Sequence, residues 1–240
     1  SFTVVNRLLK AGQAVFSMPE GPGGPGTFYV PAAAASTEIL RAATSLGVSF
    51  APAGTAPSAR MVALRSMRIG LFDVYGGSIP SGWTRLVLES FEFPYQVVFP
   101  ADLDAGNLRD RFDVLIFNGN GIPAPGGRGG GAGVGAPGAT GRAGFVPRPI
   151  PPEYARRQGS FTAATMEMVK AFARQGGTVI YIGSAVQGAA RQFDLPVTDQ
   201  LAGVPADKYF VPGSVLRVSV DPKNPLAYGL PHQVDVFFDN

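Results

Sequence analysis

The sequence contains no cysteine and only one histidine, His232, in 240 residues. Without cysteine the chain has no disulfide framework, no thiolate nucleophile and no zinc–sulfur site. Zinc sites in proteins usually draw on several His or Cys ligands, so the single histidine argues against a catalytic zinc site within these residues. We therefore expect no metal and no cofactor in this chain.

Long apolar runs are also missing. No stretch reaches the roughly 18 to 20 apolar residues needed to cross a bilayer, so we expect no membrane span. The first ten residues, SFTVVNRLLK, lack the layout of a signal peptide, because the charged residues follow the apolar ones. The start in mid-pattern suggests a piece of a longer chain. The net charge of +3 comes from Lys and Arg interleaved with acids, which indicates a solvated surface and argues against nucleic-acid binding.

Strand and helix patterns alternate after residue 66. Apolar runs at 69–74, 95–100, 113–119 and 178–184 are each followed by a helix-like stretch. The runs are continuous, which is typical of strands buried on both faces of a parallel sheet. We predict an α/β fold over residues 67–240, three-layered, with a mainly parallel, helix-flanked sheet that is flavodoxin-like in its wiring.

The helix after the first of these runs is predicted to begin at Ser81, with Ser81 as its N-cap. Trp83, Leu86, Val87 and Phe91 then recur near helical spacing.

The first 66 residues show the same patterns more weakly. Residues 2–12 and 36–47 read as helices that close on glycine, and residues 14–18, 26–32 and 48–53 read as short strands. None of these segments is large enough to bury an apolar face alone. We expect an N-terminal lobe, residues 1–66, that extends the sheet or packs on it.

Glycine and proline dominate residues 118–152, where large apolar residues nearly vanish. Such a composition does not repay the entropy of ordering, so we predict a flexible surface insertion at about 123–152, with high mobility over 124–146. The segment lacks the Gly-Lys-Ser/Thr ending of a phosphate-binding loop.

Two segments resemble the class I glutamine amidotransferase-like fold. DVLIFNGNGIP, residues 113–123, matches the position of that family's oxyanion loop, and TVIYIGSA, residues 178–185, matches its nucleophile elbow. The elbow pattern Gly-X-Cys-X-Gly is not met, because Ser184 stands at the place of the cysteine. The family's late His-X-Glu pair is replaced at best by His232 and Asp235.

A closer resemblance covers nearly the whole chain. FTVVNRLLKAGQAVF, GTFYVPA, the segment from RIGLFDVYGGSIPSGW to DRFDVLIF, and the C-terminal NPLAYGLP and VDVFFDN resemble the region that follows the catalytic domain in large bacterial zinc carboxypeptidase-like proteins. The family's zinc motif, His-X-X-Glu, is absent, and no catalytic residue is carried over. The resemblance implies a non-catalytic accessory domain whose partner is the peptidase domain of the parent chain, with zinc only in that domain and a periplasmic or extracellular location.

Ligands of open parallel sheets bind beyond the carboxyl ends of the strands. A polar cleft there would suit a peptide or sugar-like ligand. The bland alternative is that Asp73 satisfies loop amides while Trp83 packs on the sheet. The candidate residues for the cleft are Asp73, Tyr75, Ser78, Trp83, Asn118, Asn120, Gly183 and Ser184.

The alternative function is a serine hydrolase or amidase with Ser184 as nucleophile and His232 as base. Asp235 or Asp221 would orient the histidine. Nucleophile and base would then lie within about 3 Å of each other. Serine before a helix is also a common N-cap. We predict that Ser184 is a helix cap in a degenerate elbow and not a nucleophile.

Overall fold

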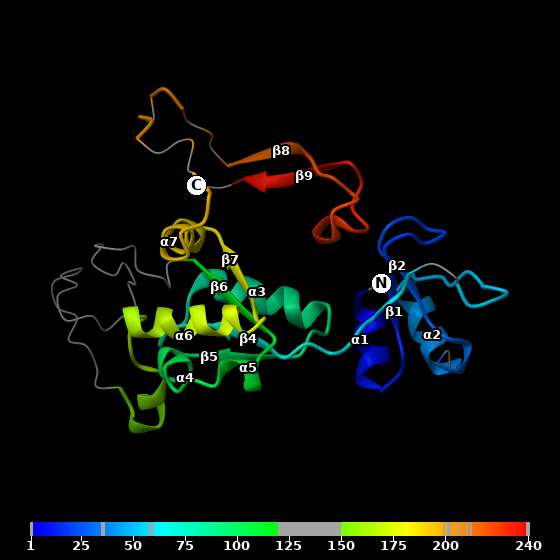
Figure 1. The fold of residues 1–240 in the computed structure, drawn as a ribbon, viewed down its shortest axis with the longest axis horizontal. Helices are drawn as coiled ribbons and strands as arrows, with labels where there is room; N and C mark the ends of the chain where they lie inside the picture. The colour runs from blue at the N-terminus through cyan, green and yellow to red at the C-terminus, as the bar shows by residue number, and fades with distance from the viewer. Residues whose placement is uncertain are drawn as a thin grey trace. The chain divides into compact units, whose positions relative to one another are not determined.

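The computed structural model describes residues 2–34, 37–57, 60–119, 150–198, 200, 203–205, 207–209, 211 and 213–238. The chain divides into two compact units (Figure 1). One unit is residues 67–199. The other combines residues 1–66 with residues 200–240, which the sequence had placed in the α/β domain. The segment for which we predicted high mobility, 124–146, lies outside the described residues.

A four-stranded parallel sheet forms the centre of the 67–199 unit. Its strand order is β5-β4-β6-β7, and all three pairings are parallel. Each strand falls inside one of the predicted apolar runs, which confirms a mainly parallel α/β sheet. The strands are β4 (Ile69–Phe72), β5 (Tyr95–Val98), β6 (Val114–Asn118) and β7 (Thr178–Ile182).

Helices lie on both faces of this sheet. Successive residues of a strand face opposite sides, and β6 shows this directly: Leu115 and Phe117 belong to one core, whereas Val114 and Ile116 belong to another. The first core includes Phe172 of α6, and the second includes Leu88 of α3, so the unit has three layers. The helices are α3 (Ile79–Ser90), α4 (Pro100–Asp104), α5 (Leu108–Arg111), α6 (Ala163–Arg174) and α7 (Ala185–Gln192), with the 3-10 turn η2 (Pro152–Arg157).

The N-cap of helix α3 lies three residues before the predicted one. Ser78 is its N-cap, and the Ser78 hydroxyl accepts a hydrogen bond from the amide of Ser81 at 3.2 Å. Pro80 fits this first turn, where a missing backbone N–H has no intrahelical partner to lose. The prediction that Ser81 caps the helix is therefore wrong, because Ser81 is buried inside the first turn.

The other unit has a small antiparallel sheet of its own, with order β2-β1-β3. This sheet does not extend the parallel one. The strand predicted at 48–53 is wrong, since those residues have no regular structure; Pro52 removes a backbone donor from it. Instead Val62 and Ala63 pair with β1. The elements up to residue 66 are α1 (Phe2–Lys10), β1 (Phe16–Met18), β2 (Thr27–Tyr29), η1 (Ala32–Ala34), α2 (Thr37–Ser45) and β3 (Val62–Ala63).

The C-terminal part of this unit is an antiparallel hairpin of β8 (Ser214–Ser219) and β9 (Gln233–Phe238), with η3 (Pro225–Ala227) between them. Across the ranges that the structure describes, no helix has the length and apolar character required to cross a membrane.

Candidate functional site

The carboxyl edge of the parallel sheet has a point where the strand order reverses. From β4 the chain moves to β5 on one side and then returns to β6 on the other. Asp73 directly follows β4, and Asn118 is the last residue of β6. Ligands of open α/β sheets bind at such a point, so the predicted positions of Asp73 and Asn118 coincide with the place where a site is expected.

The Asp73 carboxylate is buried and has hydrogen-bond partners on both oxygens. Its Oδ1 accepts from the amide of Val74 at 2.8 Å, and its Oδ2 accepts from the Ser81 hydroxyl at 2.9 Å and from Arg85 Nη2. Ser81 and Arg85 are four residues apart and therefore share one face of α3. The negative charge also lies beside the N-terminus of α3, which favours it. Asp73 thus anchors α3 to the end of β4.

The loop between Asp73 and α3 is shaped by two glycines. Gly76 and Gly77 have φ of 92° and 74°, in the left-handed region that glycine adopts at no steric cost. The centroid of the Tyr75 ring lies 6.1 Å from that of Tyr154 in η2. The guanidinium of Arg157, also in η2, lies 4.9 Å from the centroid of the Tyr154 ring. Tyr75 therefore contacts η2 by its aromatic ring.

Asn118 connects the end of β6 to α3. Its Nδ2 donates to the carbonyl of Pro80 at 3.0 Å and to the hydroxyl of Thr84. Because the Pro80 carbonyl can only accept, the amide nitrogen must face it, and this fixes the orientation of Oδ1. Oδ1 is buried, and no hydrogen-bond partner for it exists among the described residues; the same is true of Arg85 Nε.

Trp83 does not join this cluster. Trp83 is 65% exposed, so the alternative that it packs on the sheet is wrong. The other half of that alternative is found: the loop amide of Val74 donates a hydrogen bond to the Asp73 carboxylate. Trp83 is separated from Asp73 because it lies two positions after Ser81, and this spacing places Trp83 on the opposite side of the helix. Sequence reasoning missed Ser81, Thr84 and Arg85. The signal available was their spacing on one helix that follows an acidic strand end.

At the end of β7, the residue with a left-handed backbone conformation is Gly183. Gly183 has φ of 65°, whereas Ser184 has helical angles, φ −61° and ψ −18°. Ser184 occupies the N-cap position of α7, but its side chain makes no capping hydrogen bond, so the predicted cap is wrong in that respect. In a nucleophile elbow the serine itself sits on the strained turn. The backbone at Ser184 departs from that arrangement.

The proposed partners of Ser184 lie in the other unit. The ring nitrogen Nδ1 of His232 donates to the Val220 carbonyl at 2.8 Å. Asp235 accepts from Arg217 on β8 through both of its oxygens, at 2.8 and 3.1 Å, and this bond lowers the pKa of the Asp235 carboxyl. Asp221 accepts from the amide of Lys223 at 3.0 Å. Both acids proposed to orient His232 thus have other partners.

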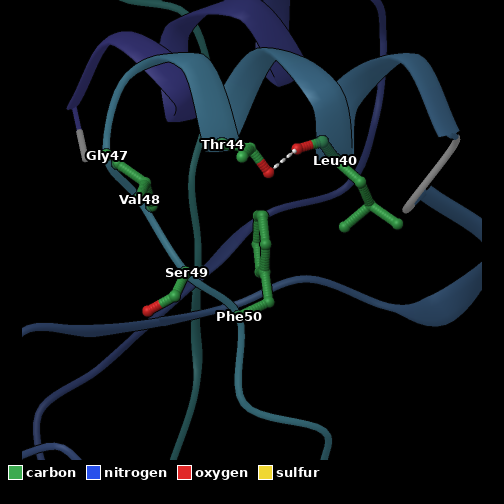
Figure 2. A pocket seen from close by; sticks show the side chains of 6 residues that line it. All are labelled: Leu40, Thr44, Gly47, Val48, Ser49 and Phe50. Atoms are coloured by element: carbon green, nitrogen blue, oxygen red, sulfur yellow. Dashed lines mark hydrogen bonds between the residues drawn. The ribbon is translucent and has the colours of Figure 1, made fainter.

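A hollow in the other unit lies beside the C-terminal end of α2 (Figure 2). Figure 2 shows the Phe50 ring below the helix, and the Thr44 hydroxyl donates to the Leu40 carbonyl at 2.9 Å. The lining has no charged side chain and contains none of the predicted site residues. It consists of Leu40, Thr44, Gly47, Val48, Ser49 and Phe50.

The remaining predictions for the site concern Asn120 and metal binding. Asn120 lies outside the described residues. Within the described ranges, no group of three or more His, Cys, Asp or Glu side chains is placed to hold a metal ion.

No protein-family model, curated protein or solved structure matches this chain. The interpretation of the site therefore depends on the chain's own contacts.

Proposed function

We propose that this chain is a non-catalytic accessory or ligand-binding domain of a zinc carboxypeptidase-like protein. The link to that family comes from the sequence resemblance. The peptidase domain of the parent protein would then be its partner, zinc would belong to that domain, and the parent would be periplasmic or extracellular.

The non-catalytic part of the proposal rests on the hydrogen bonds that the aspartate side chains after β4 and β5 accept. Asp73 is held by Val74, Ser81 and Arg85. In α4, Asp102 accepts from the Phe99 amide at 2.9 Å, and Asp104 accepts from the Thr165 hydroxyl at 2.7 Å. A general base needs a carboxylate that can reach a substrate proton. Instead, Asp73 holds α3 to the end of β4, Asp102 caps its own helix, and Asp104 joins α4 to α6.

For the fold, we propose the flavodoxin-like class, in the variant of the class I glutamine amidotransferases. Counted along the chain, the order β5-β4-β6-β7 is second, first, third, fourth. This is the order of the first four strands of the flavodoxin-like 2-1-3-4-5 sheet. An experimental structure with antiparallel central strands would contradict the proposal.

The proposed ligand is a peptide or a carbohydrate bound near the carboxyl edge. Isothermal titration calorimetry tests this, because it detects binding without a reporter side chain at the site. We expect a saturable heat of binding with a bacterial cell-wall peptide or an oligosaccharide. No saturable change with any member of a panel of both classes would remove the ligand-binding part of the proposal.

A labelling experiment tests the non-catalytic part. The chain is treated with a serine-directed fluorophosphonate and analysed by intact mass, beside Ser184→Ala and His232→Ala. We expect no stoichiometric label in any of the three proteins, because an unactivated serine hydroxyl is a weak nucleophile. Stoichiometric labelling that disappears in both variants would establish the serine hydrolase instead.

The family link has its own test. The complete gene is expected to encode a domain with a His-X-X-Glu zinc motif before this segment. A complete gene without such a domain would contradict the carboxypeptidase assignment and would leave the binding test above unaffected.

A further inference from the structure

Two buried polar atoms beside Asp73 have complementary hydrogen-bonding roles. Arg85 Nε is a donor and Asn118 Oδ1 is an acceptor, and neither has a partner among the residues that the structure describes. A buried polar group without a partner is costly, and native proteins satisfy nearly all of them with protein groups or ordered water. Each atom therefore calls for a partner, an acceptor for Nε and a donor for Oδ1.

The two side chains are fixed in the same small region. Leu71 of β4 pairs with Ile116 of β6, so Asp73 and Asn118, two residues further on, end adjacent strands about 4.8 Å apart on the same face. Arg85 is bound to Asp73, and Asn118 is bound to Thr84, the residue before Arg85. The ends of both side chains are thus held against one turn of α3.

We propose that one internal water molecule bridges Arg85 Nε and Asn118 Oδ1. Water accepts from Nε and donates to Oδ1 with the same atom, which neither a cation nor an anion does. The hydroxyl oxygens of Ser81 and Thr84 belong to the same cluster and provide further partners, as a buried water requires. The water completes the attachment of α3 to β4 and β6. This inference does not depend on the proposed function.

A crystal structure of the whole chain at a resolution that shows ordered solvent is the direct test. We expect density for one water within hydrogen-bond distance of both Arg85 Nε and Asn118 Oδ1. A direct bond from either atom to another protein group, or an empty space between them, would overturn the proposal.

Denaturation of Arg85→Lys tests the energetic consequence. Lysine keeps the positive charge opposite Asp73 but removes the Nε donor. The matched control is Arg109→Lys, because Arg109 contacts the buried Asp113 and the Phe112 carbonyl through Nη1 alone. We expect the urea midpoint to fall further for Arg85→Lys than for the control. An equal or smaller fall would mean that Nε was unpaired, since removing an unsatisfied donor carries no such loss, and would refute the bridge.

Discussion

At the scale of single residues, Asp73 is the side chain that holds Ser81 and Arg85 of α3 at the carboxyl edge of the parallel sheet. Asp73→Asn leaves one acceptor oxygen and no charge opposite Arg85. Breaking a buried ion pair costs about 3–5 kcal/mol, and because the Arg85 side chain is 36% exposed we expect a loss of about 2 kcal/mol. Urea denaturation followed by Trp83 emission measures it. The control is Glu167→Gln, which breaks an exposed pair with Lys170; equal losses in the two variants would contradict the prediction.

Tyr181 presents the opposite case, a buried hydroxyl with no hydrogen-bond partner among the described residues. Its ring stacks on Phe117 at 5.3 Å, and phenylalanine keeps that contact. Removing an unsatisfied buried group is neutral or stabilising, so we expect Tyr181→Phe to gain up to about 1 kcal/mol. Tyr95→Phe is the control, because the Tyr95 hydroxyl donates to Glu89. A clear loss of stability in Tyr181→Phe, as large as in the control, would show that the hydroxyl has a partner.

The same phenol predicts a pH dependence. Burial raises the pKa of the Tyr181 phenol above its ordinary value, which is about 10. The unfolded chain therefore loses this proton first as the pH rises. The stability that the neutral phenol contributes is present below about pH 10 and is lost above it. Urea midpoints at increasing pH should fall faster for the wild type than for Tyr181→Phe, and parallel curves would contradict this.

The residues at strand ends were predictable, whereas their partners were not. Asp73 is the first polar residue after the apolar strand β4, and Asn118 is the last residue of the apolar strand β6. Their place at the carboxyl edge therefore follows from the sequence alone. Arg85 was not identified because the apolar residues of α3 do not mark its buried face: Trp83 and Leu86 are 65% and 51% exposed. Spacing along the helix separates the face of Arg85 from the face of Trp83 but does not show which of them packs on the strand end.

At the scale of elements, the junction of α6 and β7 is set by Gly177. A Cβ at this position would lie 2.3 Å from Phe172 Cζ, and Phe172 is fully buried in the core. Overpacking of this kind costs about 1–3 kcal/mol, so Gly177→Ala is expected to lose about 3 kcal/mol. Gly176→Ala is the matched control: its Cβ meets nothing within 4 Å, although φ of 83° adds strain. Urea denaturation should rank Gly177→Ala as the less stable of the two.

Continuous apolar runs predicted all four strands of the parallel sheet, but the expected burial on both faces is found in the two central strands only. β4 and β6 are buried along their whole length. In the edge strand β7 the expectation is wrong, because Ile180 and Ile182 are 40% and 45% exposed. The segment 48–53 also has apolar residues, but Pro52 has no backbone N–H to donate to a neighbouring strand. The third strand of the antiparallel sheet β2-β1-β3 is instead β3, which has only two residues. So short a strand is defined by its partner β1 and leaves no pattern of its own.

At the scale of the whole molecule, residues 67–199 carry their cores within themselves. Both clusters of buried apolar residues that flank the parallel sheet draw only on this range, from Ile69 to Ala185. The other unit has a separate cluster, which includes Val4, Leu8 and Val15. A segment with its own core has the property that defines a domain. The sequence predicted a boundary at residue 66, where regular strand–helix alternation begins, but assigned residues 200–240 to the α/β domain, whereas they group with residues 1–66.

The same argument predicts that residues 67–199 fold when expressed alone. Hydrophobic burial is the main favourable term in folding, and truncation removes none of the residues in the two clusters. We expect a cooperative thermal transition by far-UV circular dichroism, with a matching transition in Trp83 emission. Residues 1–66 expressed alone are the comparison. If 67–199 melted without cooperativity while the whole chain showed a cooperative Trp83 transition, the parallel sheet would depend on the rest of the chain for its stability.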